Sequence, residues 1–235
     1  MTVNGILTAL EDFKKLLIEV KLFKSENSTR LRTVENKKFS QEFLQIMYSG
    51  DYEKIYTTAM NNSDYDFLLE DDSFFQISAI KFSSKKFDFK LRYAYYPNPF
   101  QYKSYKDFLK ENGLSYEEHG DAFIYEYEQY ISEAKLKNFF TPIRYDYDIS
   151  EYEPCTHAVS HLHIGLEQDM RIPISRVLTP QEFAILIIRN LYFEKWKLIL
   201  DNDNYQKILK KSKNTKNLIG DELFGDLEKK YLYLN

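Results

Sequence analysis

Apolar positions in the first quarter of the chain recur every three or four residues, the spacing that lines one face of an α-helix. The sequence therefore predicts an N-terminal helical segment over residues 1–61. The helices expected within it are 3–23, 39–48 and 52–60. A polar stretch, 24–38, separates the first helix from the second, and Gly50 marks the break before the third.

In the middle of the chain the apolar period changes to two, which is typical of β-strands. An antiparallel meander is therefore predicted over residues 65–96. Its strands are expected at 65–70, 73–82 and 87–96. Pro97 and Pro99 end the meander, because proline cannot donate a hydrogen bond to a ladder. A helix is expected at 104–112, whereas the pattern of 122–137 fits either a helix or a strand.

Three more strands are expected near 143–149, 158–164 and 170–174. Successive side chains of a strand point to opposite faces, so Leu162 and Ile164 fall on one side of the sheet and His161 and His163 on the other. The same alternation separates an apolar side from a polar side in the other two strands. Pro173 indicates that the last of the three lies at a sheet edge.

The clearest local signal is a helix start at Pro180. Thr179 supplies an N-cap hydroxyl and Glu182 completes a capping box. A helix at 180–200 is expected to cover the apolar side of the sheet and to leave the histidine side exposed. Together these elements predict an α+β fold with an antiparallel sheet in a single domain over 1–235. Further C-terminal helices are expected up to the end of the chain.

Composition narrows the class of protein. Hydrophobic residues make up 43% of the 235 positions, with 20 Tyr and 18 Phe, so a packed core is expected. A net charge of −4 argues against a protein that coats nucleic acid by bulk attraction. The sequence has one cysteine, no signal-peptide pattern and no apolar run of membrane-spanning length. We therefore expect a cytoplasmic protein that does not enter a membrane.

Three of the four histidines, His157, His161 and His163, fall within seven residues. Imidazole is the side chain best suited to move a proton or hold a metal ion near neutral pH. If the three late strands are neighbours, the histidine face also carries further polar side chains. Those singled out are Arg144, Asp146, Asp148 and Arg171.

Cleavage of a phosphodiester would use these residue types. The reaction needs a proton acceptor for the nucleophile, a proton donor for the leaving oxygen and cations for the charge on the phosphate. His161 and His163 together are predicted as the proton donor and acceptor, with Asp146 orienting an imidazole. Arg144, Arg171 and His157 are predicted to bind the substrate. The catalytic residues would then be His161, His163 and Asp146.

Other interpretations remain open at this point. The His161-x-His163 spacing, completed by Asp146 or His157, would also suit a divalent zinc, manganese or iron ion, although no cofactor is required by the sequence. The histidines could equally form only surface hydrogen bonds, and Arg144 could pair with Asp148 across strands. Cys155 lacks the setting of a nucleophilic thiol. The lysines of 207–216 are typical of a solvated face, with a weak phosphate-binding role as the alternative.

The order of these motifs resembles an uncharacterised bacterial family, a domain of unknown function, over most of the chain. The motifs are Arg144-Tyr145-Asp146, Ser160-His161-Leu162-His163-Ile164-Gly165, Arg171-Ile172-Pro173 and Leu178-Thr179-Pro180. Residues 143–190 are also similar to small toxins of the TumE type from toxin–antitoxin pairs. Tyr147 and Asp148 stand where those toxins often carry two histidines, and the long aromatic N-terminal half is a second departure.

The toxin resemblance implies that Arg144, Asp146, His161 and His163 correspond to the polar motif of that family. It also implies a role in a toxin–antitoxin or anti-phage system, with RNA as the target. The function predicted from the sequence is therefore a nuclease-like effector acting on RNA or another phosphodiester. The alternatives are a non-catalytic partner or sensor subunit that binds a protein encoded nearby, and a metal-dependent enzyme acting on a small molecule. The sequence leaves the oligomeric state open.

Overall fold

The computed structural model describes residues 3–32, 39–81, 89–137, 140–166, 170–200 and 217–231. The chain forms two compact units. The first consists of Met1–Pro97 and Thr141–Asn235, and the second of Asn98–Phe140. The sequence did not indicate that the second unit would be separate. That the whole of 1–235 folds as one domain stays a prediction.

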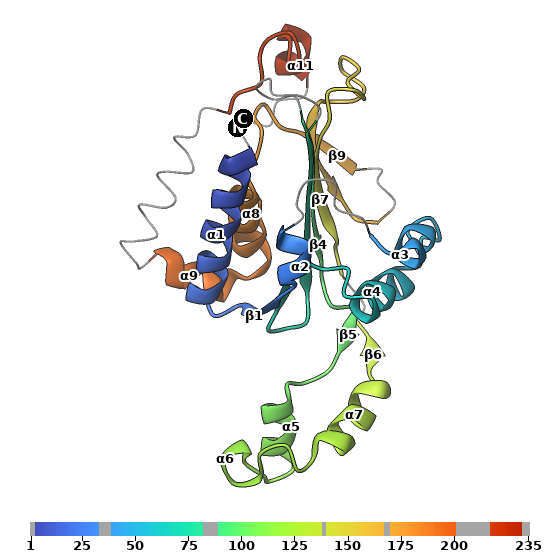
Figure 1. Ribbon diagram of the computed structural model, residues 1–235, viewed down its shortest axis with the longest axis vertical. Helices are drawn as coiled ribbons and strands as arrows, with labels where there is room; N and C mark the ends of the chain where they lie inside the picture. Colours follow the sequence, from blue (N-terminus) through green and yellow to red (C-terminus); the bar gives the residue numbers. More distant parts are fainter. Residues whose placement is uncertain are drawn as a thin grey trace. The chain divides into compact units, whose positions relative to one another are not determined.

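The first unit is built on a seven-stranded antiparallel sheet, which confirms the predicted α+β class (Figure 1). Its strands, in spatial order, are β1 (Phe23–Glu26), β2 (Phe67–Leu69), β3 (Phe74–Lys81), β4 (Phe89–Tyr96), β7 (Ile143–Tyr147), β8 (Ser160–Ile164) and β9 (Met170–Pro173). The meander and the three later strands were all predicted. The chain leaves the sheet after β4 and returns beside it as β7, so both halves share one sheet. Strand β9, which ends at Pro173, lies at an edge as expected.

The first helix was wrongly expected to run to residue 23, and no element was assigned to the start of the polar stretch that follows it. Helix α1 (Val3–Glu19) ends before residue 23, and Lys21 adopts a left-handed conformation with φ of 55°. The amide of Leu22 then donates to the carbonyl of Leu17 at 2.9 Å, which closes the helix end and reverses the chain. Strand β1 can therefore pair with β2, and the short helix α2 (Ser28–Arg32) follows.

One face of the sheet is covered by helices, as predicted. These are α1, α8 (Pro180–Leu191) and α9 (Phe193–Leu200), which lie together on one side of the sheet in Figure 1. Phe13 of α1 and Phe183 of α8 both pack on Phe75 of β3, with ring centroids 4.9 and 6.1 Å apart. Each large apolar side chain buried in this way contributes roughly 1.5 to 3 kcal/mol. The apolar side of the sheet is thus the main core.

The opposite face is shared between an aromatic patch and polar side chains. Helices α3 (Gln41–Ile46) and α4 (Tyr52–Asn61), both expected from the sequence, pack there against the middle strands. Tyr52 stacks on Tyr96, and Tyr56 contacts Phe74 at 5.6 Å between ring centroids. These aromatic contacts cover β3 and the end of β4. They leave the polar positions of β4, β7, β8 and β9 outside the aromatic patch.

The second unit is small and rich in aromatic residues. It contains α5 (Tyr105–Glu111), α6 (Tyr116–His119), α7 (Ile124–Ser132) and the two-stranded pair β5 (Phe100–Gln101) and β6 (Lys135–Leu136). The open segment 122–137 is therefore mostly helical. Tyr105, Phe108 and Tyr127 pack with ring centroids 5.2 to 6.5 Å apart and form its interior.

The C-terminal end has less helix than expected within the described residues. Among the described residues 217–231, where further helix was expected, only α11 (Asp226–Tyr231) is helical. The basic stretch 207–216 lies outside the described residues. Among the residues that are described, no helix combines the length and apolar character needed to cross a membrane.

The capping box that starts α8 is present as predicted. Glu182 donates its backbone amide to the Thr179 hydroxyl at 3.2 Å, and the Glu182 carboxylate accepts from the Thr179 amide at 2.7 Å. The Glu182 carboxylate also pairs with Arg176. This cap fixes the point at which the chain turns from the sheet into the helix that covers it.

We predict that Thr179→Ala lowers the free energy of unfolding by about 1 kcal/mol, because an amide at the start of α8 loses its partner. Thr179→Ser keeps the hydroxyl and should stay within about 0.5 kcal/mol of the parent. Urea unfolding followed by circular dichroism measures both. Equal stability of the alanine and serine variants would show that the cap does not stabilise the fold.

Candidate functional site

Strand register brings the predicted polar residues into two neighbouring rows. His163 of β8 lies directly opposite Arg144 of β7 on one side and Arg171 of β9 on the other. In the next row His161 lies opposite Asp146. Side chains at directly opposed positions share a face of the sheet. The three late strands are therefore neighbours, as the sequence analysis required.

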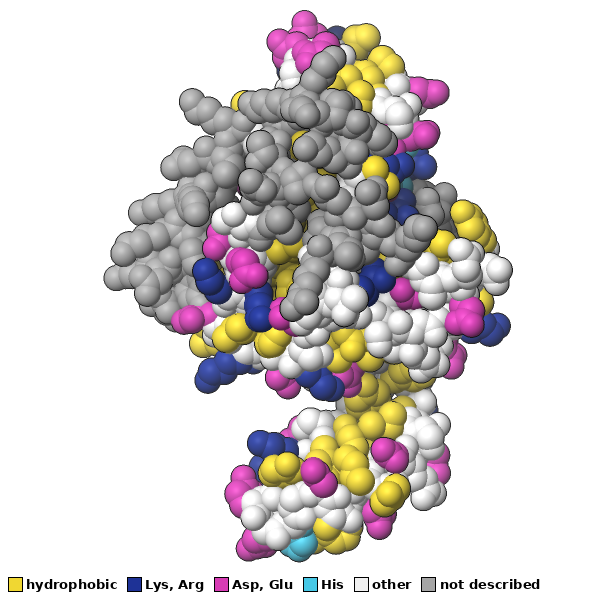
Figure 2. All heavy atoms as spheres, viewed as in Figure 1, with side chains coloured by type: hydrophobic (Ala, Val, Ile, Leu, Met, Phe, Trp, Pro, Cys, Tyr) yellow, Lys and Arg dark blue, Asp and Glu magenta, His cyan; other side chains and the backbone are white. Residues whose placement is uncertain are grey.

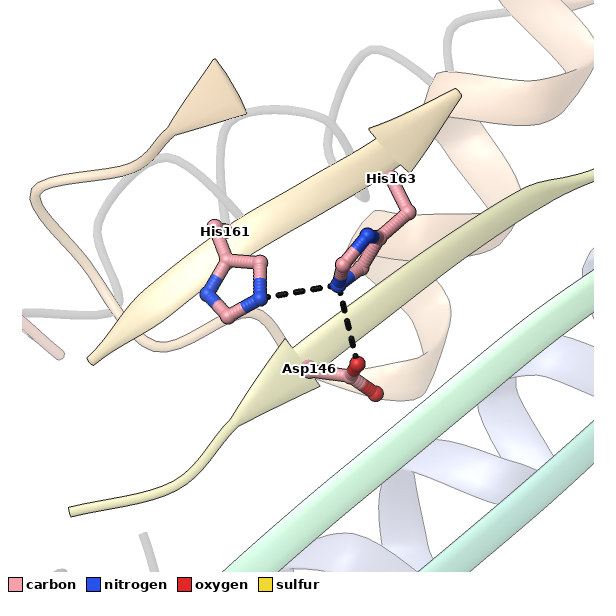
Figure 3. A group of neighbouring side chains, drawn as sticks. All are labelled: Asp146, His161 and His163. Carbon is pink, nitrogen blue, oxygen red and sulfur yellow. Dashed lines mark hydrogen bonds and ion pairs between the residues drawn. The ribbon is translucent and has the colours of Figure 1, made fainter. Parts of the chain in front are cut away.

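Asp146, His161 and His163 form a contact group, which we call the histidine–aspartate group. The two imidazoles project from β8 toward each other, with their Nε2 atoms 2.9 Å apart (Figure 3). His163 Nε2 also lies 3.2 Å from Asp146 Oδ2 on β7. Three polar atoms from two strands thus converge on one point.

His161 is held in a defined tautomer. Its Nδ1 lies 2.7 Å from the carbonyl oxygen of Ala158, and because a carbonyl can only accept, Nδ1 must carry the proton. Burial lowers the pKa of His161 to about 4, since the charged ring would lose its hydration and faces His163 nearby. The ring is therefore neutral near pH 7. Its Nε2 then presents a lone pair toward His163.

Asp146 is held as a carboxylate. Burial alone would raise its pKa, but the hydrogen bond from His163 and the charges of Arg144 and Arg92 lower the pKa to about 2. Arg144 Nε donates to Asp146 Oδ2 at 2.8 Å. Asp146 therefore stays ionised at neutral pH and provides the negative charge of the group.

The expectation of an exposed histidine face is wrong. His161 and His163 are only 2% and 3% exposed. The loop between β7 and β8 folds back over the sheet, and the His157 ring packs edge-on against His161 at 4.9 Å between centroids. The alternative of an Arg144–Asp148 pair is also wrong, because Arg144 binds Asp146 and Asp148 instead pairs with Lys90 at 2.5 Å.

A pocket of about 170 Å³ gives access to this group. Its lining residues are Lys90, Arg92, Arg144, Asp146, Asp148, Glu151, His157, His161, His163 and Arg171. All six residues predicted as catalytic or substrate-binding are among them, so the structure brings the whole predicted set together. Their roles stay predictions. Cys155 is exposed and does not line the pocket.

Sequence analysis missed Lys90 and Arg92. The alternation of strand 87–96 does place both on the polar side, because they alternate with the apolar residues Phe89, Leu91 and Tyr93. What could not be read from the sequence is that β4 lies next to β7, since the 43 residues of the second unit, Asn98–Phe140, separate the two strands along the chain. The positive charge of the pocket was therefore underestimated.

The histidine–aspartate group also has the composition of a metal site. Among the described residues, Asp146, His161 and His163 offer one ligand atom each, all within 4.8 Å of one another. His157 does not belong to that group. Of the two metal sets left open by the sequence, the one completed by Asp146 is thus the one that the fold assembles.

Comparison with known proteins gives one match. Residues 17–235 match the family described as Uncharacterized conserved protein (DUF2290). No curated protein and no solved structure matches the chain. The comparisons do not show the likeness to TumE-type toxins, which stays a prediction. Because the family match spans nearly the whole length, the chain belongs to this family of uncharacterized conserved proteins.

Proposed function

We propose that the chain is a nuclease-like enzyme that cleaves RNA or another phosphodiester in the pocket above the histidine–aspartate group. The observation that carries the proposal is the meeting of two kinds of groups in one pocket. A neutral imidazole and an ionised carboxylate lie at its floor, and Lys90, Arg92, Arg144 and Arg171 line it. Cations and a proton-accepting group are what phosphoryl chemistry requires.

The four cations have different tasks in this proposal. Lys90 and Arg144 are already paired with Asp148 and Asp146. Arg171 is exposed on the edge strand and has no ion pair with any residue in the described part of the chain. Its guanidinium can therefore take a phosphate in a bidentate way without giving up a carboxylate. We assign Arg171 as the first phosphate anchor and Arg92 as the second.

The chemical step consumes one nucleophile and one phosphodiester. The oxygen of a water molecule or of a ribose 2′-hydroxyl forms a new bond to phosphorus while the bond to the leaving oxygen breaks. The proton of the nucleophile passes to the histidine–aspartate group, the leaving oxygen takes up a proton from solvent water, and the group later returns its proton to solvent. Because the two rings touch, they lie on one side of a bound phosphate. We therefore propose that they act together on the nucleophile, in place of the separate donor and acceptor roles expected from the sequence.

The biological setting that we propose is a bacterial toxin–antitoxin or anti-phage system, acting in the cytoplasm. Its support is the resemblance of residues 143–190 to TumE-type toxins. The pocket is compatible with such a target, since proteins that bind single-stranded RNA follow its backbone with positively charged groups.

A second candidate function is a non-catalytic partner or sensor subunit that binds a protein encoded nearby. The observation that favours it is the exposed apolar surface of the second unit, visible as yellow side chains over α5 to α7 in Figure 2. Tyr125 of α7 is 79% exposed. In that case Tyr125→Ala would weaken a stoichiometric complex in pull-down, whereas substitutions of His161 and His163 would leave it unchanged.

RNA cleavage tests the proposed enzyme function. Purified protein should cleave mixed RNA, and His161→Asn combined with His163→Asn should lower the rate at least about 100-fold, because the proton-accepting group is lost. Asparagine at position 161 keeps a donor for the Ala158 carbonyl. The matched control is His119→Asn, the histidine of the second unit, which lies outside the pocket and should leave the rate unchanged.

Circular dichroism of each variant keeps loss of folding apart from loss of chemistry. If the double variant is folded and cleaves RNA at the parental rate, the proposed enzyme function is wrong. Cleavage activity that does not coelute with the folded parent protein would point to a contaminating nuclease and would also refute the proposed enzyme function.

Substitution of Arg171 tests its assignment as the first phosphate anchor. Arg171→Gln should raise KM for RNA about 10-fold or more with little change in kcat, because the residue binds a phosphate in the ground state and in the transition state alike. The salt dependence of binding should become shallower by about one ion. Arg189 of α8 is exposed, so Arg189→Gln is the matched control and should change neither quantity. An unchanged KM in Arg171→Gln would remove that residue from the substrate site.

A further inference from the structure

We infer that Asp146, His161 and His163 bind a divalent first-row transition metal ion at the floor of the pocket. The inference rests on the proposed function, concerns the same site and names its cofactor. With an ion bound, the lone pairs of the group would hold the metal, and an ionised metal-bound water would supply the nucleophile in place of proton transfer to the group. Metal binding can be measured without any substrate, however, so the inference and the proposed function can fail separately.

A single proton, on His163 Nε2, lies between two acceptors of the group. His161 carries its proton on Nδ1, so its Nε2 offers a lone pair, and Asp146 Oδ2 offers another. Both lie next to His163 Nε2, at 2.9 and 3.2 Å. One proton on His163 Nε2 can be donated well to only one of these two acceptors. A cation placed among the three atoms would satisfy all of them.

The spacing also fits metal coordination. Bonds from such an ion to imidazole nitrogen and carboxylate oxygen are about 2.1 Å long, so two ligands at a right angle lie about 3 Å apart. The separations from His163 Nε2 to His161 Nε2 and to Asp146 Oδ2 are 2.9 and 3.2 Å. The remaining pair lies within 4.8 Å and needs only a small side-chain adjustment. Two histidines and one carboxylate on one side of an ion leave its other positions open.

Two of the three proposed ligands have hydrogen-bond partners of the kind that orient ligands in metal-binding proteins. Metal-binding histidines commonly donate the second ring nitrogen to a carbonyl, and His161 does so to Ala158. Ligating carboxylates are commonly held by a second partner, and Arg144 holds Asp146. Oδ2 has two lone pairs, so it can accept from Arg144 and still bind an ion. His163 differs, because its Nδ1 is buried without a hydrogen-bond partner in the described part of the chain.

The open side of the ion would face the substrate pocket. That pocket is lined by Lys90, Arg92 and Arg171 in addition to the three ligands. A metal with three protein ligands and open positions is the arrangement of catalytic sites, whereas structural sites are closed by four protein ligands. Such an ion polarises a phosphoryl oxygen and lowers the pKa of a bound water. The two imidazole nitrogens favour a transition metal ion such as zinc over calcium or magnesium.

The test uses the full-length chain after treatment with a chelator and gel filtration. Co²⁺ is titrated as a spectroscopic probe, and Zn²⁺ and Mn²⁺ are titrated by calorimetry. We expect one ion per chain and a Co²⁺ absorption band that Zn²⁺ removes. Asp146→Asn should weaken binding at least about 100-fold, since the loss of an outer partner alone costs about 10- to 100-fold. His119→Asn is the matched control and should bind as the parent does.

Two results would overturn the metal site: no saturable binding of any of the three ions, or equal binding by folded Asp146→Asn. The second would place the ion elsewhere. If the parent protein binds no metal but still cleaves RNA with excess chelator, the proposed enzyme function holds, with the histidine–aspartate group accepting the proton in place of a metal. Conversely, binding of one ion without cleavage of RNA or of bis(p-nitrophenyl) phosphate would uphold the metal site and refute the proposed function.

Discussion

The antiparallel pairing of β7 with β8 is the constraint on which the site depends. It sets Asp146 opposite His161 and Arg144 opposite His163, so that the carboxylate and both imidazoles meet at one point. A shift of register by one residue would turn these side chains into the apolar core and bring Tyr145 out of it. The register is fixed from the other side of the sheet, where the Tyr145 hydroxyl accepts from the Leu178 amide at 3.0 Å and contacts Ser160 at 2.9 Å.

The two faces of the sheet therefore support each other. On one face, aromatic and aliphatic side chains pack under α1 and α8 and hold the strands in register. On the other face, the same alternation gathers polar groups, where burial keeps His161 neutral while the hydrogen bond from His163 and the charges of nearby arginines keep Asp146 ionised. Buried polar groups are costly unless they are paired, and here most of them are paired with one another. The apolar core thus maintains a polar site that would not assemble by itself.

Much of this arrangement could be predicted from the sequence because it depends on local patterns. Alternation located the strands, and the Thr179 capping box located the start of α8. The predicted polar face contained five of the six candidate residues that line the pocket, and the sixth, His157, lies in the loop before β8. What could not be predicted depends on contacts between distant segments. Strand β1 needed its partner β2, and the contribution of Arg92 needed the pairing of β4 with β7 across the second unit. Burial of the histidines depended on the fold of the loop that carries His157.

Nitrogen-15 NMR of the histidine rings tests the central claim most directly, namely that lone pairs of His161 and His163 converge beside Asp146. In metal-free protein near pH 7, we expect a neutral His161 with its proton on Nδ1. Addition of Zn²⁺ should shift the Nε2 resonances of His161 and His163 and leave those of His119 unchanged. A His161 that is charged or protonated on Nε2, or rings that do not respond to Zn²⁺ together, would contradict the account.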